Sequence, residues 1–142
     1  MRKTAEDLMS GLVIYMNFRD DLAKAWKMMR DNSIRHLIVL DDEHDMVGIL
    51  SDRDCLRAVR SESFPSARGQ IVESTFPEGI TIREFMRSPV KTVQFDASTD
   101  RIAEIMNEFK ISALVVQSAG RVVGVVTEYD LLRDYIEIIR RT

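Results

Sequence analysis

The chain reads Val47-Gly48-Ile49-Leu50-Ser51-Asp52-Arg53-Asp54-Cys55-Leu56-Arg57 and, 76 residues later, Val123-Gly124-Val125-Val126-Thr127-Glu128-Tyr129-Asp130-Leu131-Leu132-Arg133. Each copy has a short apolar run, then Ser/Thr-x-x-Asp, then apolar residues that continue beyond the motif. The apolar run predicts a buried strand, and a hydroxyl three residues before an acid predicts the start of a helix. The doubled stretch therefore places a hydroxyl and a carboxylate at two matched points where a strand leads into a helix.

The duplication continues upstream with a spacing of 77 residues. The matched pairs include Met9 and Met86, Phe18 and Phe95, and Met29 and Met106. The first copy has one extra residue in the polar stretch 40–46, which an exposed turn tolerates. We therefore predict two repeats, residues 4–60 and 81–141, joined by a linker over 61–80 and related by an approximate two-fold axis.

Both repeats show the same order of predicted elements, helix–strand–helix–strand–strand–helix, so the predicted class is mixed α/β. Apolar residues at i, i+3, i+4 and i+7 predict helices around 22–29 and 102–109. Continuous apolar runs predict strands covered on both faces at 37–40 and 114–116. The other predicted strands are 13–16, 46–50, 90–93 and 122–126. The final helices follow Ser51 and Thr127, and the second has an apolar stripe of Leu132, Tyr135, Ile136 and Ile139.

The bulk composition excludes several classes of protein. The 142 residues are 45% hydrophobic and 30% charged, with a net charge of −3. This acidic balance argues against nucleic-acid binding as a function, because binders of the phosphate backbone carry a basic surface. No apolar stretch is long enough to cross a bilayer or to form a signal-peptide core, and the single Cys55 fits a reducing compartment. We therefore expect a cytoplasmic protein with no membrane partner.

The doubled motif, preceded in the first copy by Ile34-Arg35-His36-Leu37-Ile38-Val39, resembles the cystathionine-β-synthase (CBS) domain, and its tandem occurrence resembles a CBS pair. The resemblance implies an α+β fold of two β-α-β-β-α repeats, packed through their sheets about a pseudo-two-fold axis with clefts between them. It further implies binding of an adenosyl ligand such as AMP, ADP, ATP, S-adenosylmethionine or NAD, with no obligatory cofactor. Such pairs commonly form homodimers and regulate an effector protein.

The motif residues suit a nucleotide for chemical reasons. A carboxylate accepts hydrogen bonds from both vicinal hydroxyls of a ribose, which is the role predicted for Asp54 and Asp130. The hydroxyls of Ser51 and Thr127 stand at helix starts, where they can donate to a phosphate. The apolar side chains predicted to enclose the purine are Val13, Ile14 and Ile34 in the first repeat and Val90 and Ile111 in the second. The cations predicted to reach phosphates are Arg35, His36 and Arg53.

The Ser/Thr-x-x-Asp pattern is also that of a capping box, in which the hydroxyl and the acid satisfy free N–H groups at a helix start. A cap and a ligand site do not exclude each other. Where the first repeat has Arg35 and His36, the second has Ser112 and Ala113. We therefore predict that one site binds its ligand clearly and the other weakly or not at all.

Together these features predict a stand-alone regulatory CBS pair without catalytic activity, which binds an adenosyl ligand between its repeats and acts on a partner protein. A structural dimerisation module with empty pockets is the alternative. Ser51 has no motif-like His partner, and His36, His44 and Cys55 are not spaced as metal ligands. The matched arginines that follow the motifs, Arg57 and Arg133, are predicted on a solvated helix face or in a dimer salt bridge.

Overall fold

The computed structural model describes residues 2–59 and 76–142, and the chain divides into two compact units. The central unit comprises Ile14–Val90, and the C-terminal unit combines Met1–Val13 with Lys91–Thr142. Most of the linker predicted over 61–80 therefore lies outside the described residues. Phe76, just after this gap, is buried against Trp26 with ring centroids 5.8 Å apart, so this end of the linker is anchored in the central unit.

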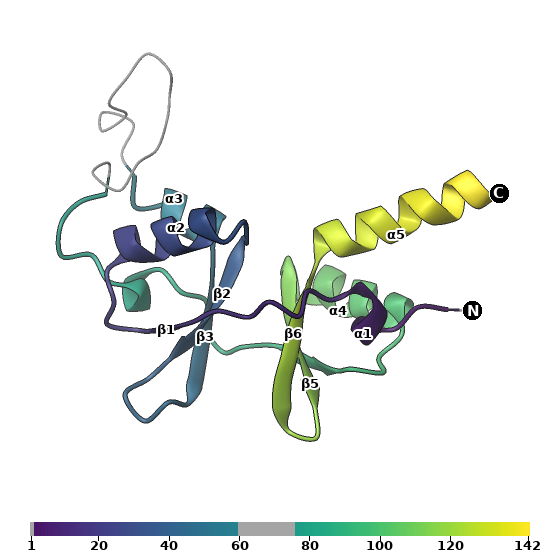
Figure 1. Cartoon of the computed structure of the whole chain (residues 1–142), viewed down its shortest axis with the longest axis horizontal. Coiled ribbons are helices and arrows are strands. Elements are labelled where there is room, and N and C mark those ends of the chain that lie inside the picture. The colour runs from purple at the N-terminus through teal and green to yellow at the C-terminus, as the bar shows by residue number, and fades with distance from the viewer. Residues whose placement is uncertain (1, 60–75) are drawn as a thin grey trace, which may run out of the picture. The chain divides into compact units, whose positions relative to one another are not determined.

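A three-stranded sheet forms the basis of the central unit (Figure 1). Its elements are β1 (Tyr15–Asn17), α2 (Leu22–Asp31), β2 (His36–Leu40), β3 (Met46–Ser51), α3 (Asp52–Leu56) and the 3-10 helix η3 (Ile82–Glu84). Strand β2 is central, parallel to β1 and antiparallel to β3. The parallel pair requires a crossover, which α2 supplies. Helix α2 buries Leu22, Ala25 and Met29 against the sheet, as its spacing predicts.

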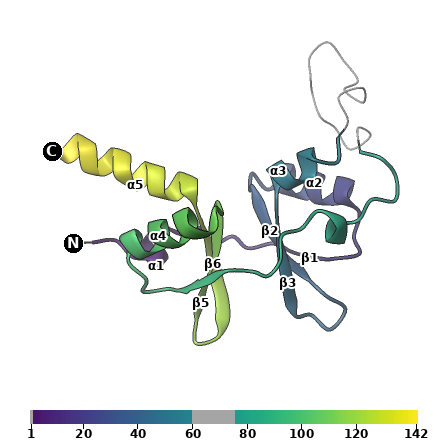
Figure 2. The same ribbon diagram turned by 180° about the vertical axis from the view of Figure 1, so that it is seen from behind.

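The C-terminal unit repeats this arrangement (Figure 2). Its elements are α1 (Ala5–Leu8), β4 (Thr92–Gln94), α4 (Thr99–Phe109), β5 (Ala113–Ser118), β6 (Arg121–Thr127) and α5 (Glu128–Arg141). Strand β5 is central, parallel to β4 and antiparallel to β6. Ile102 and Met106 of α4 pack with Leu8 of α1 in the core of this unit. The predicted α/β class and element order are thus confirmed.

The two repeats exchange their first segments. Residues 4–13 begin the first repeat but lie in the C-terminal unit, whereas residues 81–90 begin the second repeat and lie in the central unit. Short antiparallel bridges fix these segments, Ser10 opposite Val125 and Arg87 opposite Ile49. The predicted repeats, residues 4–60 and 81–141, are defined by the duplication in the sequence. The compact units are defined by which segments pack together, so their bounds differ from those of the repeats.

Each exchanged segment pairs with the edge strand of its sheet beside the glycine of the repeated motif. A Cβ atom added to Gly48 would lie 2.5 Å from the sulfur of Met86. A Cβ added to Gly124 would lie 2.5 Å from the sulfur of Met9 and 2.6 Å from the carbonyl oxygen of Ser10. Glycine is required here because only a residue without a side chain lets another backbone approach this closely.

The first strand of each unit starts two residues later than predicted, at Tyr15 and Thr92. The preceding carbonyls already contribute, because Ile14 accepts a hydrogen bond from the N–H of Ile38 and Lys91 accepts one from Val115. The residues before them, Val13 and Val90, are the last of their segments before the chain passes from one unit to the other. Periodicity alone does not reveal that passage.

Helix α5 departs most clearly from the pattern of a core helix. Five of its large apolar side chains are 46–59% exposed: Leu132, Tyr135, Ile136, Ile138 and Ile139. The residues it buries are Asp130 and Asp134. The predicted apolar stripe therefore exists, but it faces away from the core of the C-terminal unit.

Candidate ligand-binding sites

Both repeated motifs form capping boxes at a strand-to-helix junction. Ser51 ends β3, and its Oγ accepts a hydrogen bond from Asp54 N at 3.0 Å while its own N–H donates to Asp54 Oδ2 at 2.8 Å. Thr127 ends β6 and donates from its N–H to Asp130 Oδ2 at 2.8 Å. The extended backbone of each hydroxyl residue and the helical backbone after it produce this geometry. The capping interpretation of the motif is thus confirmed as local structure.

The second carboxylate oxygen of each acid is paired with arginine. Asp54 Oδ1 accepts from Arg87 Nε at 3.0 Å and from Arg57 Nη2 at 3.3 Å. Asp130 Oδ1 lies 3.3 Å from Arg133 Nη2. The side chain of Asp54 is 1% exposed and that of Asp130 is 11% exposed. Both acids are therefore turned toward their own backbone, and Asp54 is the more completely enclosed by its partners.

Arg57 and Arg133 lie three residues after these acids and pair with them; Arg133 belongs to α5, and Arg57 is the C-cap residue of α3. Their side chains remain more than half exposed, as predicted for a solvated surface. Arg57 also donates to the carbonyl oxygen of Phe85 at 2.7 Å. Arginine at this position is thus a partner of the motif acid within its own unit, a contact that the sequence analysis did not assign.

The backbones of the residues predicted as cations lie next to Ser51 in the sheet or in the chain. His36 lies directly opposite Ser51 in the β2–β3 pairing, and the carbonyl of Arg35 accepts a hydrogen bond from Asp52 N at 3.0 Å. Arg53 belongs to the first turn of α3. In the C-terminal unit Ala113 takes the place opposite Thr127, so the two motifs have the same backbone but different neighbours.

All five apolar residues predicted around the purine are partly buried, but they are grouped differently from the prediction. Ile14, Ile34 and Val90 belong to the central unit, and Val13 and Ile111 belong to the C-terminal unit. Val13 and Val90 have changed places because each lies in an exchanged segment. The prediction had grouped these residues by repeat, which is not how the chain packs.

The sequence analysis missed Arg87, which forms the shortest of the ion pairs to the two motif acids. Its signal was present in the duplication, since a spacing of 77 residues matches Arg87 with Ser10. The difference in charge between Arg87 and Ser10 could not be linked to the motifs from the sequence, because only the structure shows that the exchanged segments pass beside them.

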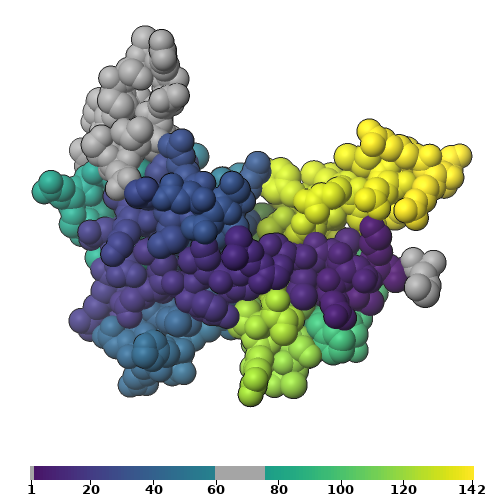
Figure 3. All heavy atoms as spheres, in the orientation of Figure 1, coloured from purple at the N-terminus to yellow at the C-terminus, as the bar shows by residue number. Residues whose placement is uncertain are grey.

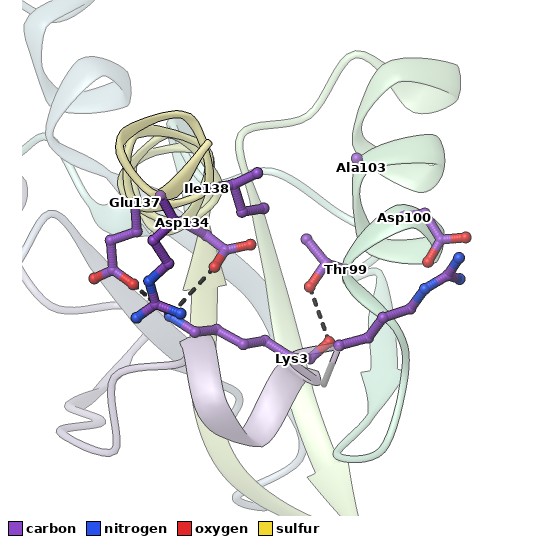
Figure 4. A pocket seen from close by; sticks show the side chains of 9 residues that line it. Lys3, Thr99, Asp100, Ala103, Asp134, Glu137 and Ile138 are labelled. Carbon is purple, nitrogen blue, oxygen red and sulfur yellow. Dashed lines mark hydrogen bonds and ion pairs between the residues drawn. The ribbon is translucent and has the colours of Figure 1, made fainter.

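A cavity of about 430 Å³ lies elsewhere in the C-terminal unit, between the N-terminal segment, α4 and α5 (Figure 4). Lys3 Nζ pairs with Glu137 at 2.8 Å and with Asp134 at 3.2 Å, and Thr99 donates to the carbonyl of Lys3 at 2.9 Å. The hydrogen bond between Lys3 and Glu137 raises the pKa of Lys3 and lowers the pKa of Glu137. None of the predicted site residues lines this cavity. Figure 3 shows the N-terminal segment (purple) beside α5 (yellow) on the surface of the unit.

Two other groups of potential chemical interest have structural explanations. Burial raises the pKa of the Cys55 thiol to about 12, with smaller effects from Asp54 and Asp52, so the thiol stays protonated at neutral pH. Asp41, Glu43 and Asp45 bring carboxylate oxygens within 4.8 Å of one another in the β2–β3 turn. Asp41 Oδ1 accepts the N–H groups of Glu43 and Asp45, which orders this turn.

The two units define a class of protein: a pair of matched three-stranded α+β modules, each with a capping box where its last strand meets a helix. The CBS domain model matches residues 5–61 and 82–137, and the chain belongs to the CBS domain family. In the part of the chain that the structure describes, no helix is both long and apolar enough to span a membrane.

Relatives and solved structures extend this result. The chain is 33% identical over 135 residues to protein MJ1404 of Methanocaldococcus jannaschii, covering 94% of this chain but only 32% of that protein's length. It is 28% identical over 130 residues to hypoxic response protein 1 of Mycobacterium tuberculosis, covering 92% and 83% of the two chains.

Among solved structures, the CBS domain pair of protein MJ0100, in complex with 5′-methylthioadenosine and S-adenosyl-L-methionine, matches with a TM-score of 0.77 and 25% identity. This match covers 97% of this chain and 99% of that one. The CBS domain protein TA0289 from Thermoplasma acidophilum matches with a TM-score of 0.73 and 28% identity, covering 100% and 78%.

Proposed function

We propose that this chain is a regulatory CBS pair that binds an adenosyl ligand beside its Ser/Thr-x-x-Asp motifs and acts on a partner protein. The observation that carries the proposal is the complex of the MJ0100 CBS pair with two adenosyl compounds, because that pair matches nearly the whole of this chain. Two matched capping boxes in this chain supply the groups that such a ligand needs.

The acids can take a ribose without losing their caps. In each motif Oδ2 holds the backbone N–H, whereas Oδ1 pairs with exposed arginine. Exposed ion pairs contribute little net stability, since water solvates a released guanidinium well. Ribose hydroxyls can therefore replace Arg57 at Oδ1 of Asp54, where the shorter contact of Arg87 remains, or Arg133 at Oδ1 of Asp130, while the helix start stays intact.

The hydroxyl of Ser51 remains able to donate. Its oxygen accepts from Asp54 N, and its proton has no acceptor among residues 2–59 and 76–142. A hydroxyl carries one donor besides its acceptor positions, so Ser51 can give a hydrogen bond to a ligand anion. A regulatory output follows if a partner has different affinities for the ligand-bound and ligand-free arrangements.

A thermal-shift screen tests the proposal with AMP, ADP, ATP, S-adenosylmethionine, 5′-methylthioadenosine and NAD. A ligand present at about 100 times its dissociation constant stabilises the folded state by roughly 2.7 kcal/mol, which gives a clear rise in Tm. Isothermal titration then gives the affinity and stoichiometry of each positive compound. If no compound raises Tm and none gives a binding isotherm, the proposal is wrong.

Helix α5 favours a second function, self-association, which does not depend on a ligand. Its outward face carries the exposed apolar stripe of α5 residues described above, and a contiguous exposed patch of this kind marks an interaction site. Glu128 stands in the first turn and Arg140 and Arg141 in the last. Two antiparallel copies of α5 place each acidic start beside the basic end of the other, so we propose a homodimer through this face.

Sedimentation velocity tests the dimer with the variant Ile136→Glu. Burying a carboxylate without a partner opposes association, so the variant is expected to sediment as a monomer at concentrations where the wild type is a dimer. Leu12→Glu is the matched control, since Leu12 is 53% exposed and lies outside α5. A wild type that remains monomeric, or an Ile136→Glu variant that remains dimeric, contradicts the proposed interface.

A further inference from the structure

The two motif sites have opposite charge balances. We call the surroundings of Ser51 and Asp54 the Ser51 site, and those of Thr127 and Asp130 the Thr127 site. At the Ser51 site Arg57 and Arg87 pair with Asp54, and the positions matched between the repeats add Arg35, Arg53 and the acid Asp52 close by in the sequence. The Thr127 site has one arginine and two acids: Arg133, Glu128 and Asp130. The backbone is the same, so this difference is available to select ligands by charge.

Of the two arginines that pair with Asp54, Arg87 makes the shorter contact. It lies in the exchanged segment that bridges to Ile49, and its Nε donates to Asp54 Oδ1 at 3.0 Å. Its two Nη groups have no hydrogen-bond partner among the described residues, and the side chain is 60% exposed. A guanidinium fixed through Nε presents both Nη groups in one plane, which suits the oxygens of a phosphate.

Asp54 supplies the anchor for Arg87. Its carboxylate is buried and is held on its other oxygen by the N–H of Ser51, so its position is set by the start of α3. The arginine is thus directed from a rigid group rather than from a mobile surface acid. At the matching place in the C-terminal unit stands Ser10, whose backbone makes the equivalent bridge to Val125.

Other differences act in the same direction. The hydroxyl of Thr127 lies 3.3 Å from Asp130 Oδ2 and is directed to that acid, whereas Ser51 Oγ accepts from the backbone and keeps its proton for a ligand. Lys91 does not restore a cation to the Thr127 site, because its ammonium lies over the Phe109 ring, 4.2 Å from the ring centroid.

We propose that the Ser51 site selects adenosyl ligands that carry phosphate, with Arg87 as the specificity-determining residue. The Thr127 site, which lacks that arginine, selects adenosyl ligands without phosphate. This inference rests on the proposed function and adds the ligand class of each site. It predicts that one chain holds two chemically different adenosyl compounds.

The experiment is isothermal titration of the whole chain with two probes, ADP and 5′-methylthioadenosine. The variant Arg87→Ser gives the Ser51 site a serine, the residue type that Ser10 supplies at the matching position of the Thr127 site. We expect it to weaken ADP binding about tenfold or more, the effect of losing a hydrogen bond to a charged group, and to change 5′-methylthioadenosine binding less than about twofold. Arg87→Lys, which keeps the charge but loses the planar fork, is expected to lie between wild type and Arg87→Ser.

The reciprocal variant Ser10→Arg places a guanidinium beside Asp130 and is expected to add a second ADP site. Thermal unfolding without ligand shows that each variant is folded, and retained 5′-methylthioadenosine binding shows the same for the two Arg87 variants. If Arg87→Ser leaves ADP affinity unchanged, or weakens both probes by the same factor, the assignment is overturned while adenosyl binding stands. If the wild type binds neither probe nor any other adenosyl compound, the proposed function itself fails.

Discussion

The two helices that follow the repeated motifs differ although they begin in the same way. Both α3 and α5 start with a capping box and carry an arginine three residues after the motif acid. Helix α3 then ends after five residues, whereas α5 runs for fourteen and exposes its apolar face. A capping motif therefore fixes where a helix begins, but the sequence beyond it decides how far the helix runs and what it contacts.

The surroundings of the two motifs also differ, because residues outside the motifs contribute to them. Arg87 and Ser10 are brought to their sites by segments that the two repeats exchange, and neither belongs to the motif it adjoins. A duplicated motif preserves its internal hydrogen bonds in each copy. Part of the charge beside each copy comes from elsewhere in the chain, and that part differs between Arg87 and Ser10.

The largest expected effect comes from the glycines that admit the exchanged segments. Gly124→Ala is expected to lower the free energy of unfolding by about 3 kcal/mol and Gly48→Ala by about 1–2 kcal/mol, the range for overpacked sites. The order follows from the added Cβ, which would meet the backbone oxygen of Ser10 at 2.6 Å but that of Arg87 at 3.1 Å. Urea unfolding of both variants measures the difference.

Gly11→Ala serves as the control for that comparison, because a Cβ at Gly11 has no atom within 4 Å. If Gly48→Ala and Gly124→Ala are as stable as Gly11→Ala, close backbone approach is not the reason for the glycine in the motif.

A smaller effect is expected from removing the charge of the motif acids. Asp54→Asn loses its pairing with two arginines and is expected to cost about 2 kcal/mol, whereas Asp130→Asn loses one arginine and is expected to cost about 1 kcal/mol. Chemical denaturation of each variant without ligand gives these values. Equal losses would show that Arg87 contributes nothing to the stability of the central unit.

The smallest effect concerns the ion pairs that attach the N-terminal segment to α5. The pKa of Glu137 is lowered from 4.5, so its contribution is present above that pH and lost as the pH falls through the folded value. The pKa of Lys3 is raised from 10.5, so its contribution is present below that pH and lost as the pH rises through the folded value.

The variant Lys3→Met is therefore expected to lower Tm by a constant small amount between pH 4.5 and 10.5, and by less outside this window. Thermal unfolding across pH checks this. Lys24→Met, on the exposed side of α2, controls for the loss of one positive charge. A difference between Lys3→Met and wild type that persists unchanged at both extremes of pH would show that the ion pairs are not its cause.

Much of the fold follows directly from local patterns in the sequence. The apolar runs at β2 and β5 and the stripes of α2 and α4 predict these elements, because burial selects side chains at the period of the element. The capping boxes at Ser51 and Thr127 are equally local, since all of their hydrogen bonds lie within four residues. Because these patterns occur in both copies, each element is predicted independently from two stretches of the sequence.

The sequence determined a doubled α/β chain with a hydroxyl and an acid at each strand-to-helix junction, because short-range hydrogen bonds and side-chain periodicity are written in neighbouring residues. Only the tertiary structure decided that residues 4–13 and 81–90 change places, that Arg87 reaches Asp54, and that the apolar side of α5 lies outside its unit's core. These outcomes depend on which distant segments pack together. A periodic pattern shows that a face is apolar but not which surface covers it.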